Sequence, residues 1–323
     1  MKQALKKTLY LVLRIVISLG LIGWILLKVD RRELAESLKN IEYWYLTAAL
    51  AAYLMVNALC TWRWQILLAA RGIRSGYWRL FRYFLNGLFF GNFLPTTVGG
   101  DLARAYLVVD DCSKKSEALA SVLVDRFIGL FGVIITGIIG LVLMAKTGQE
   151  QALLRYMAIG VGVILALVVL FLNKALMRKL RVLLKLPLLA GAEHQIVDFY
   201  HSLYVYRTHK NEVLLAFLQS LSVQLFVVVT AYFIARSIGI DIAVIPFFLY
   251  MPVIAAISMV PLSINGWGLQ EWAFIVFFGR AGVPKAEALS LGFVYHLVAV
   301  AISVWGGVLW LMYGHRRKKG RHL

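Results

Sequence analysis

Six stretches of this 323-residue chain are each long and apolar enough to cross a lipid bilayer. A helix needs about 20 mostly apolar residues to span a hydrocarbon core of about 30 Å. Because lipid offers no partner to an unpaired backbone group, these stretches must be helical. The composition agrees, since 61% of the residues are hydrophobic and 15% are charged, against about 25% charged in soluble domains. We predict an all-α polytopic membrane protein. Its six full transmembrane helices are expected at about 8–28, 43–62, 117–145, 152–172, 213–238 and 288–312.

Lysine and arginine are distributed unevenly between the two sets of segments that flank these spans. With the N-terminus in the cytoplasm, the cytoplasmic segments hold 22 of them and the opposite loops hold 9. Such an excess is typical of short cytoplasmic loops, where it fixes orientation and meets anionic head groups. We therefore expect an integral protein of a bacterial-type cytoplasmic (inner) membrane, with the N-terminus and C-terminus cytoplasmic and anionic lipid at that face.

Several other partners are disfavoured by the same sequence. The net charge of +18 does not indicate nucleic acid, because no basic and aromatic module interrupts the apolar spans. Cys60 and Cys112 have no CxxC partner, and the six histidines show no paired ligand spacing. We expect no nucleic-acid partner, no metal and no cofactor, and the sequence does not specify an oligomeric state.

Two further apolar segments, 80–112 and 242–285, are broken in the middle by proline, glycine and asparagine. Each half is too short to span a bilayer, which is typical of a re-entrant helical hairpin. Irregular backbone at membrane depth is tolerated only where it lines a cavity or is buried in protein. The predicted break residues are Pro95, Gly99 and Gly100 in the first hairpin and Pro261, Asn265, Gly266 and Gly268 in the second.

The two broken segments lie in regions of similar design. Aligned without a gap, their polar landmarks pair Asp101 with Glu271, Glu117 with Glu287, Asp125 with Tyr295, and Arg126 with His296. We predict one transmembrane domain, 1–323, with two repeats that are inverted because their hairpins enter from opposite sides. Repeat one is 43–145 with its hairpin at 80–112, and repeat two is 213–312 with its hairpin at 242–285. A basic cytoplasmic linker with an amphipathic helix, 173–212, joins them.

Ionisable side chains at membrane depth are the candidate substrate-binding residues, because burying one costs about 2.5 kcal/mol or more unless it is paired. These candidates are Asp101, Arg104, Asp125, Arg126 and Glu271. Asp101 and Arg104 share a face at the start of a half-helix, where Gly99 and Gly100 leave backbone amides open to an anion. Arg126 carries a guanidinium, which matches a phosphate bidentately.

Structural explanations of the same residues remain open. Asp101 could cap its helix and pair with Arg104, and Glu271 could cap the corresponding helix. Asp125 and Arg126 are adjacent and cannot share a face, so one should support the hairpin while the other faces the pathway.

Two residues outside this candidate set have simpler expected roles. His296 is expected to be packed and hydrogen-bonded. Arg63, which lies between Trp62 and Trp64, is expected to anchor its helix at the membrane interface.

These features favour a lipid transporter over an enzyme. There is no nucleophile elbow, Walker loop or metal-ligand spacing, so no catalytic residue is predicted. Two oppositely facing hairpins with buried charge instead suggest a flippase-like protein that moves a phospholipid or lipid-linked head group by alternating access. The alternative is a membrane-embedded transferase that acts on a lipid-linked substrate, with Asp101 or Glu271 as general base. A third possibility is a partner that recruits a peripheral enzyme.

The motifs "GNFLPTTVGGDLARAYLV", "EALASVLVDRFIGLFG" and "PLSINGWGLQEWAF" resemble the lysylphosphatidylglycerol synthase transmembrane (flippase-like) family. The resemblance covers nearly the whole chain. It implies functional positions at Pro95, Gly99, Gly100, Asp101, Arg104, Asp125, Arg126, Gly266, Gly268 and Glu271. The chain ends at Leu323 without the soluble aminoacyl-transfer domain of the bifunctional members. The resemblance therefore implies a stand-alone member that moves a lipid rather than one that synthesises lysyl-lipid.

Overall fold

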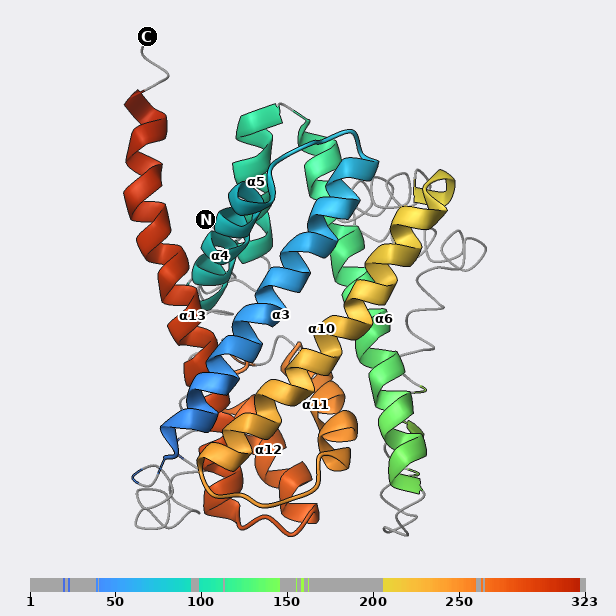
Figure 1. Cartoon of the computed structure of the whole chain (residues 1–323), viewed down its shortest axis with the longest axis vertical. Coiled ribbons are helices and arrows are strands. Elements are labelled where there is room, and N and C mark those ends of the chain that lie inside the picture. The colour runs from blue at the N-terminus through green and yellow to red at the C-terminus, as the bar shows by residue number, and fades with distance from the viewer. Residues whose placement is uncertain are drawn as a thin grey trace, which may run out of the picture.

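In the computed structural model, every regular element of the described residues is a helix (Figure 1). The described residues are 41–93, 99–112, 114–145, 206–259, 263 and 265–319, with the isolated positions 20, 23, 39, 155, 158, 159 and 162. Their α-helices are α3 (Tyr43–Ala70), α4 (Tyr77–Phe93), α5 (Gly99–Cys112), α6 (Lys115–Ala145), α10 (Lys210–Ser237), α11 (Ile245–Ser258), α12 (Leu269–Arg280) and α13 (Lys285–Lys319). A short 3-10 turn, Tyr206–Thr208, precedes α10.

Four of these helices, α3, α6, α10 and α13, are long and apolar enough to cross a membrane. They coincide with four of the six predicted spans. The predicted spans 8–28 and 152–172, and most of the linker 173–212, lie outside the described residues. Large apolar side chains are exposed along the outer faces of the long helices, where a membrane supplies apolar surroundings that water does not. Examples are Leu54, Met55, Ile138, Ile139, Val142, Leu214, Leu218, Val304, Trp305 and Leu311.

Two helical hairpins approach each other from opposite ends of the molecule (Figure 1). The first consists of α4 and α5, and the second of α11 and α12. Their tips meet, because Asn265 Nδ2 donates to Asn92 Oδ1 at 2.5 Å. The contact joins residues that are far apart in the sequence and brings the two hairpins together.

Glycine allows close backbone approach inside the first hairpin. A Cβ on Gly100 would lie 2.2 Å from the carbonyl oxygen of Gly87, so α4 and α5 can touch only if this position lacks a side chain. In the second hairpin, Asn265, Gly266 and Gly268 have φ of 49°, 81° and 83°, the left-handed region that favours glycine and asparagine. Pro95 and Pro261 lie outside the described residues.

The packing of the two halves is reciprocal. α3 lies along α10 in the centre, while α4 packs on α13 and α11 packs on α6. Both hairpin contacts depend on glycine. A Cβ on Gly306 of α13 would lie 2.0 Å from the carbonyl oxygen of Leu85, and one on Gly140 of α6 would lie 2.5 Å from the backbone nitrogen of Leu249.

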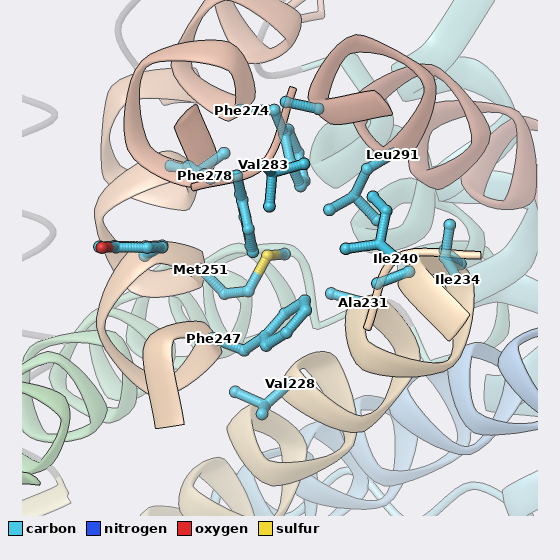
Figure 2. Close-up of a cluster of buried hydrophobic side chains, with 14 of the residues drawn as sticks. Val228, Ala231, Ile234, Ile240, Phe247, Met251, Phe274, Phe278, Val283 and Leu291 are labelled. Carbon is cyan, nitrogen blue, oxygen red and sulfur yellow. The ribbon is translucent and has the colours of Figure 1, made fainter. Parts of the chain in front are cut away.

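The largest apolar core surrounds the second hairpin (Figure 2). It joins α10, α11, α12 and α13, and its centre is aromatic, with Phe247, Phe274 and Phe278 all fully buried. A smaller cluster around Trp64 and Leu80 supports the first hairpin. The second hairpin is thus held in a dry core, whereas the first lies beside buried charge.

Candidate functional site

Five charged side chains form a continuous chain of alternating sign beside the first hairpin. In order, they are Arg63 of α3, Asp125 of α6, Arg104 of α5, Asp101 of α5 and Arg126 of α6. Arg63 Nε and Arg104 Nη2 donate to the two oxygens of Asp125, at 2.7 and 2.9 Å. Arg104 Nε donates to Asp101 Oδ1 at 3.1 Å, and Arg126 Nε donates to Asp101 Oδ2. Each carboxylate is therefore shared between two guanidinium groups.

The exposure of the side chains rises along this row of charges from Arg63 to Arg126. The side chains of Arg63, Asp125 and Arg104 are at most 7% exposed, Asp101 is 15% exposed and Arg126 is 53% exposed. Asp125 and Arg126 are adjacent in sequence, and the structure separates them as the spacing predicted, one buried and one accessible. Arg126 is thus the most exposed of the five charged side chains.

Arg104 is held by two carboxylates and two aromatic rings. Besides its two carboxylate partners, its guanidinium lies 4.9 Å from the ring centre of Trp64 and 5.0 Å from that of Phe84. Trp64 is itself fixed by a 3.0 Å hydrogen bond from its indole nitrogen to Ser121 Oγ. A cation between two aromatic rings is stabilised electrostatically, so Arg104 presents its charge from a preorganised position.

Arg63 is buried and does not anchor α3 at the membrane interface, so that expectation was wrong. α3 continues to Ala70, eight residues past the predicted end of the span, and this carries Arg63 into the interior. There its Nη1 donates to Ser220 Oγ of α10 at 3.2 Å, and Ser220 in turn donates to the carbonyl of Ile128. A buried arginine must find such partners, because an unpaired charge at membrane depth is costly.

A cavity of about 440 Å³ lies between the charged chain and the tips of the two hairpins. The charged side chains among its described lining residues are Arg63, Asp101, Arg104, Asp125 and Arg126. Three arginines against two aspartates give the lining a formal net charge of +1. The second hairpin contributes neutral residues, among them Ser258, Ser263 and Asn265. Among the described residues, no group of three or more His, Cys, Asp or Glu side chains is placed to hold a metal ion.

Glu271, the fifth predicted site residue, is not brought to this cavity. Its Oε2 accepts the backbone N–H of Gly268 at 2.6 Å, which caps its own helix, and its Oε1 contacts His296 Nδ1 at 3.0 Å. The His296 ring also stacks on Trp267, with ring centres 3.8 Å apart. Both carboxylate oxygens are occupied, and Glu271 is 3% exposed. His296 is packed and hydrogen-bonded, as expected.

Sequence reasoning missed several residues at this site. Arg63 and Ser220 complete the charged chain, and Asn92 joins the tips. The sequence could have placed Arg63 inside the helix, because the first glycine after it is Gly72 and a glycine commonly follows the last turn of a helix. In the structure Gly72 has a φ of 68° and directly follows the C-cap residue of α3. Ser220 and Asn92 had none, since isolated small polar residues are common in apolar helices and carry no fixed role.

Comparisons of the sequence with known proteins identify similar membrane proteins. A family model described as the transmembrane region of lysylphosphatidylglycerol synthase matches residues 11–307. The chain is also similar to a UPF0104 membrane protein of Methanothermobacter thermautotrophicus. The two are 24% identical over 307 residues, which cover 88% of this chain and 90% of that protein. No solved structure matches the chain.

Proposed function

The chain belongs to the family of the lysylphosphatidylglycerol synthase transmembrane region, and we propose that this integral membrane protein is a lipid flippase-like transporter. It moves a phospholipid or lipid-linked head group between leaflets by alternating access. The observation that carries the proposal is the cationic cavity between the tips of two opposed hairpins. A phosphate needs such a site at membrane depth, because hydrocarbon cannot solvate its charge.

Arg126 is the proposed point of first contact with the phosphate. It is the accessible end of the charged chain, and its partner Asp101 also accepts from Arg104. A guanidinium can bind a phosphate with two parallel hydrogen bonds. When Arg126 turns from Asp101 to a phosphate, Asp101 keeps its bond to Arg104, so no carboxylate is left unpaired.

Alternating access is proposed to act through the hairpin tips. The Asn92–Asn265 bridge closes the tips against each other, and its opening would expose the cavity to the other leaflet. In this proposal the two halves are inverted repeats with both termini in the cytoplasm of a bacterial-type inner membrane. The reciprocal packing of α4 on α13 and α11 on α6 supports that arrangement.

A membrane-embedded transferase has weaker support at this site. A general base must be positioned to reach the proton that it removes. Asp101 and Asp125 each accept from two arginines, and Glu271 accepts from Gly268 and contacts His296. All three carboxylates therefore serve in structural or binding contacts.

The test is leaflet-resolved lipid movement in proteoliposomes with an acyl-labelled anionic phospholipid. The wild-type protein is expected to equilibrate the leaflets faster than empty liposomes do. Arg126→Gln removes a charge-assisted contact and should slow the movement about tenfold, and Asp101→Asn should slow it as well. Arg280→Gln is the matched control, because Arg280 is exposed at the end of α12 and does not line the cavity.

Two results would contradict the proposal. Equal rates for the wild type, the cavity variants and empty liposomes would end the transport function. A lipid of altered mass after incubation with the protein would instead favour the transferase, which mass spectrometry of the same vesicles detects.

A further inference from the structure

The cavity has two chemically different sides, contributed by the two hairpins. The side of the first hairpin carries the charged chain that ends at Arg126. The side of the second hairpin offers hydroxyl and amide groups, from Ser258, Ser263 and Asn265. Gln224 of α10 adds a further amide to the lining. A ligand that fills this space meets guanidinium groups at one end and neutral hydrogen-bonding groups at the other.

One buried polar atom on each side has no partner within the part of the chain that the structure describes. These atoms are Arg104 Nη1 and Ser263 Oγ, and their residues are 4% and 2% exposed. Leaving a buried donor or acceptor unpaired is costly, so such groups in native proteins usually have a partner or a functional role. Both residues line the same cavity. One ligand with an anionic oxygen for Arg104 and a hydroxyl for Ser263 would satisfy both.

The tip residues add further capacity for hydroxyl groups. The Asn92–Asn265 bridge uses one amide hydrogen of Asn265 and one lone pair of the Asn92 oxygen. Each side-chain amide has two donors and an acceptor oxygen, so both can form additional hydrogen bonds. Ser258 donates its hydroxyl to the carbonyl of Ile254 at 2.8 Å and keeps its lone pairs as acceptors. Donors and acceptors thus occur together, which suits a hydroxyl group because it is both.

The charges of the cavity disfavour an ammonium group in the ligand. Among the described lining residues, Asp101 and Asp125 are the only carboxylates, and both already bind two arginines. A primary amine would therefore enter a site of net positive charge and would compete with arginine for its only anionic partners. An uncharged substituent has no such penalty.

We propose that this cavity selects a phosphodiester whose remaining part is an uncharged polyol, such as glycerol or a sugar. The arginines on the side of the first hairpin bind the phosphate. On the side of the second hairpin, Ser263 forms a hydrogen bond with a hydroxyl of the polyol. This inference names the substrate class of the site in the proposed function and rests on it. It assigns to Ser263 a specificity role that is separate from phosphate binding.

The test is equilibrium binding of short-chain phospholipids to the purified full-length protein. Dihexanoyl forms of phosphatidylglycerol and phosphatidylinositol are compared with those of phosphatidylethanolamine and phosphatidic acid. The two polyol lipids are expected to bind at least about fivefold more tightly than phosphatidylethanolamine, because only they add hydroxyl contacts without an ammonium. Equal or tighter binding of phosphatidylethanolamine would overturn the proposal.

Variants separate the two sides of the cavity. Ser263→Ala should weaken the polyol lipids about fivefold and leave phosphatidic acid unchanged, whereas Arg126→Gln should weaken every lipid that carries a phosphate. Ser263→Thr keeps a hydroxyl and should bind like the wild type if Ser263 Oγ makes the contact. Ser290→Ala is the control, since Ser290 is a buried serine that bonds to the carbonyl of Ala286 and does not line the cavity. An equal loss for phosphatidic acid in Ser263→Ala would overturn the assigned role.

Soluble glycerophosphoglycerol, the head group without its lipid, distinguishes this inference from the proposed function. Binding weaker than that of phosphatidylglycerol is expected, because the acyl chains also contact the protein. If the soluble head group binds as tightly as the lipid and vesicles show no lipid movement, the substrate class stands and the flippase fails. If vesicles show movement but binding does not distinguish head groups, the flippase stands and this inference fails.

Discussion

The two halves of the molecule carry an acidic and a basic residue at matching positions, and the surroundings of the two pairs differ. In the first, Asp101 pairs with Arg126, and in the second, Glu271 pairs with His296. Each acid lies in the first turn of the second half-helix, and each base lies on the long helix that follows. The residues are those that the gapless alignment of the two regions had paired, so their contacts support a duplicated frame.

The surroundings of these two pairs separate their roles. The side chain of Arg126 is 53% exposed beside a cavity, and the row of five charges that it completes contains one more arginine than aspartate. The His296 side chain is 4% exposed and stacks on Trp267, near an aromatic core. Matching positions thus carry accessible charge in one half and a closed, packed contact in the other.

The largest expected effect on this comparison comes from Asp125, the shared partner of two buried arginines. Asp125→Asn leaves Arg63 and Arg104 without their common counter-charge and should lower the free energy of unfolding by about 3–5 kcal/mol, the usual cost of breaking a buried ion pair. SDS-titration unfolding of the purified protein measures it. Tyr295→Phe, at the aligned position of the second half, is the matched control and should cost less than about 1 kcal/mol. A similar loss for both variants would show that the charged chain has no special structural role.

Effects of intermediate size are expected when the two basic residues, Arg126 and His296, are replaced. His296→Phe can keep the stack on Trp267 but removes a polar partner of the buried Glu271, so we expect a loss of about 1–3 kcal/mol in stability. Arg126→Gln should cost less than about 1 kcal/mol, because its side chain is half exposed. Lipid movement per folded molecule should show the opposite order, with Arg126→Gln slow and His296→Phe near the wild type. If His296→Phe abolished movement in folded protein, the second pair would also belong to the transport pathway.

Much of this architecture follows from the sequence because the membrane allows few alternatives. Four described spans and both breaks were predicted from hydrophobic length and from proline and glycine. The convergence of Asp101, Arg104, Asp125 and Arg126 was predictable in kind, since charge at membrane depth must be paired. Their order in an alternating chain was not, because it depends on the rotation of three helices about their axes.

One wrong prediction and one alternative that the sequence left open have specific physical causes. The predicted span ended at residue 62, just before Arg63, where the apolar run stops. The helix itself continues to Ala70 and ends just before Gly72, where its backbone can turn. A charge inside a helix does not end it when other helices supply partners. Glu271 remained ambiguous because an acid in a first turn suits both capping and ligand binding. Only the three-dimensional contact with His296 shows how both of its oxygens are used.

The smallest expected effect concerns the hydrogen bond between the hairpin tips, from Asn265 to Asn92. Asn92→Ala and Asn265→Gly each remove it, and glycine is chosen at 265 because it tolerates the φ of 49° found there. A double-mutant cycle on the free energy of unfolding should give a coupling of about 0.5–1.5 kcal/mol. Asn57→Ala replaces Asn92→Ala in the control cycle and should be additive with Asn265→Gly, because Asn57 bonds within α3 to Tyr53. If the bridge forms in the closed state of an alternating cycle, its loss should speed lipid movement modestly. Slower movement would show that the tips must stay joined for the head group to pass.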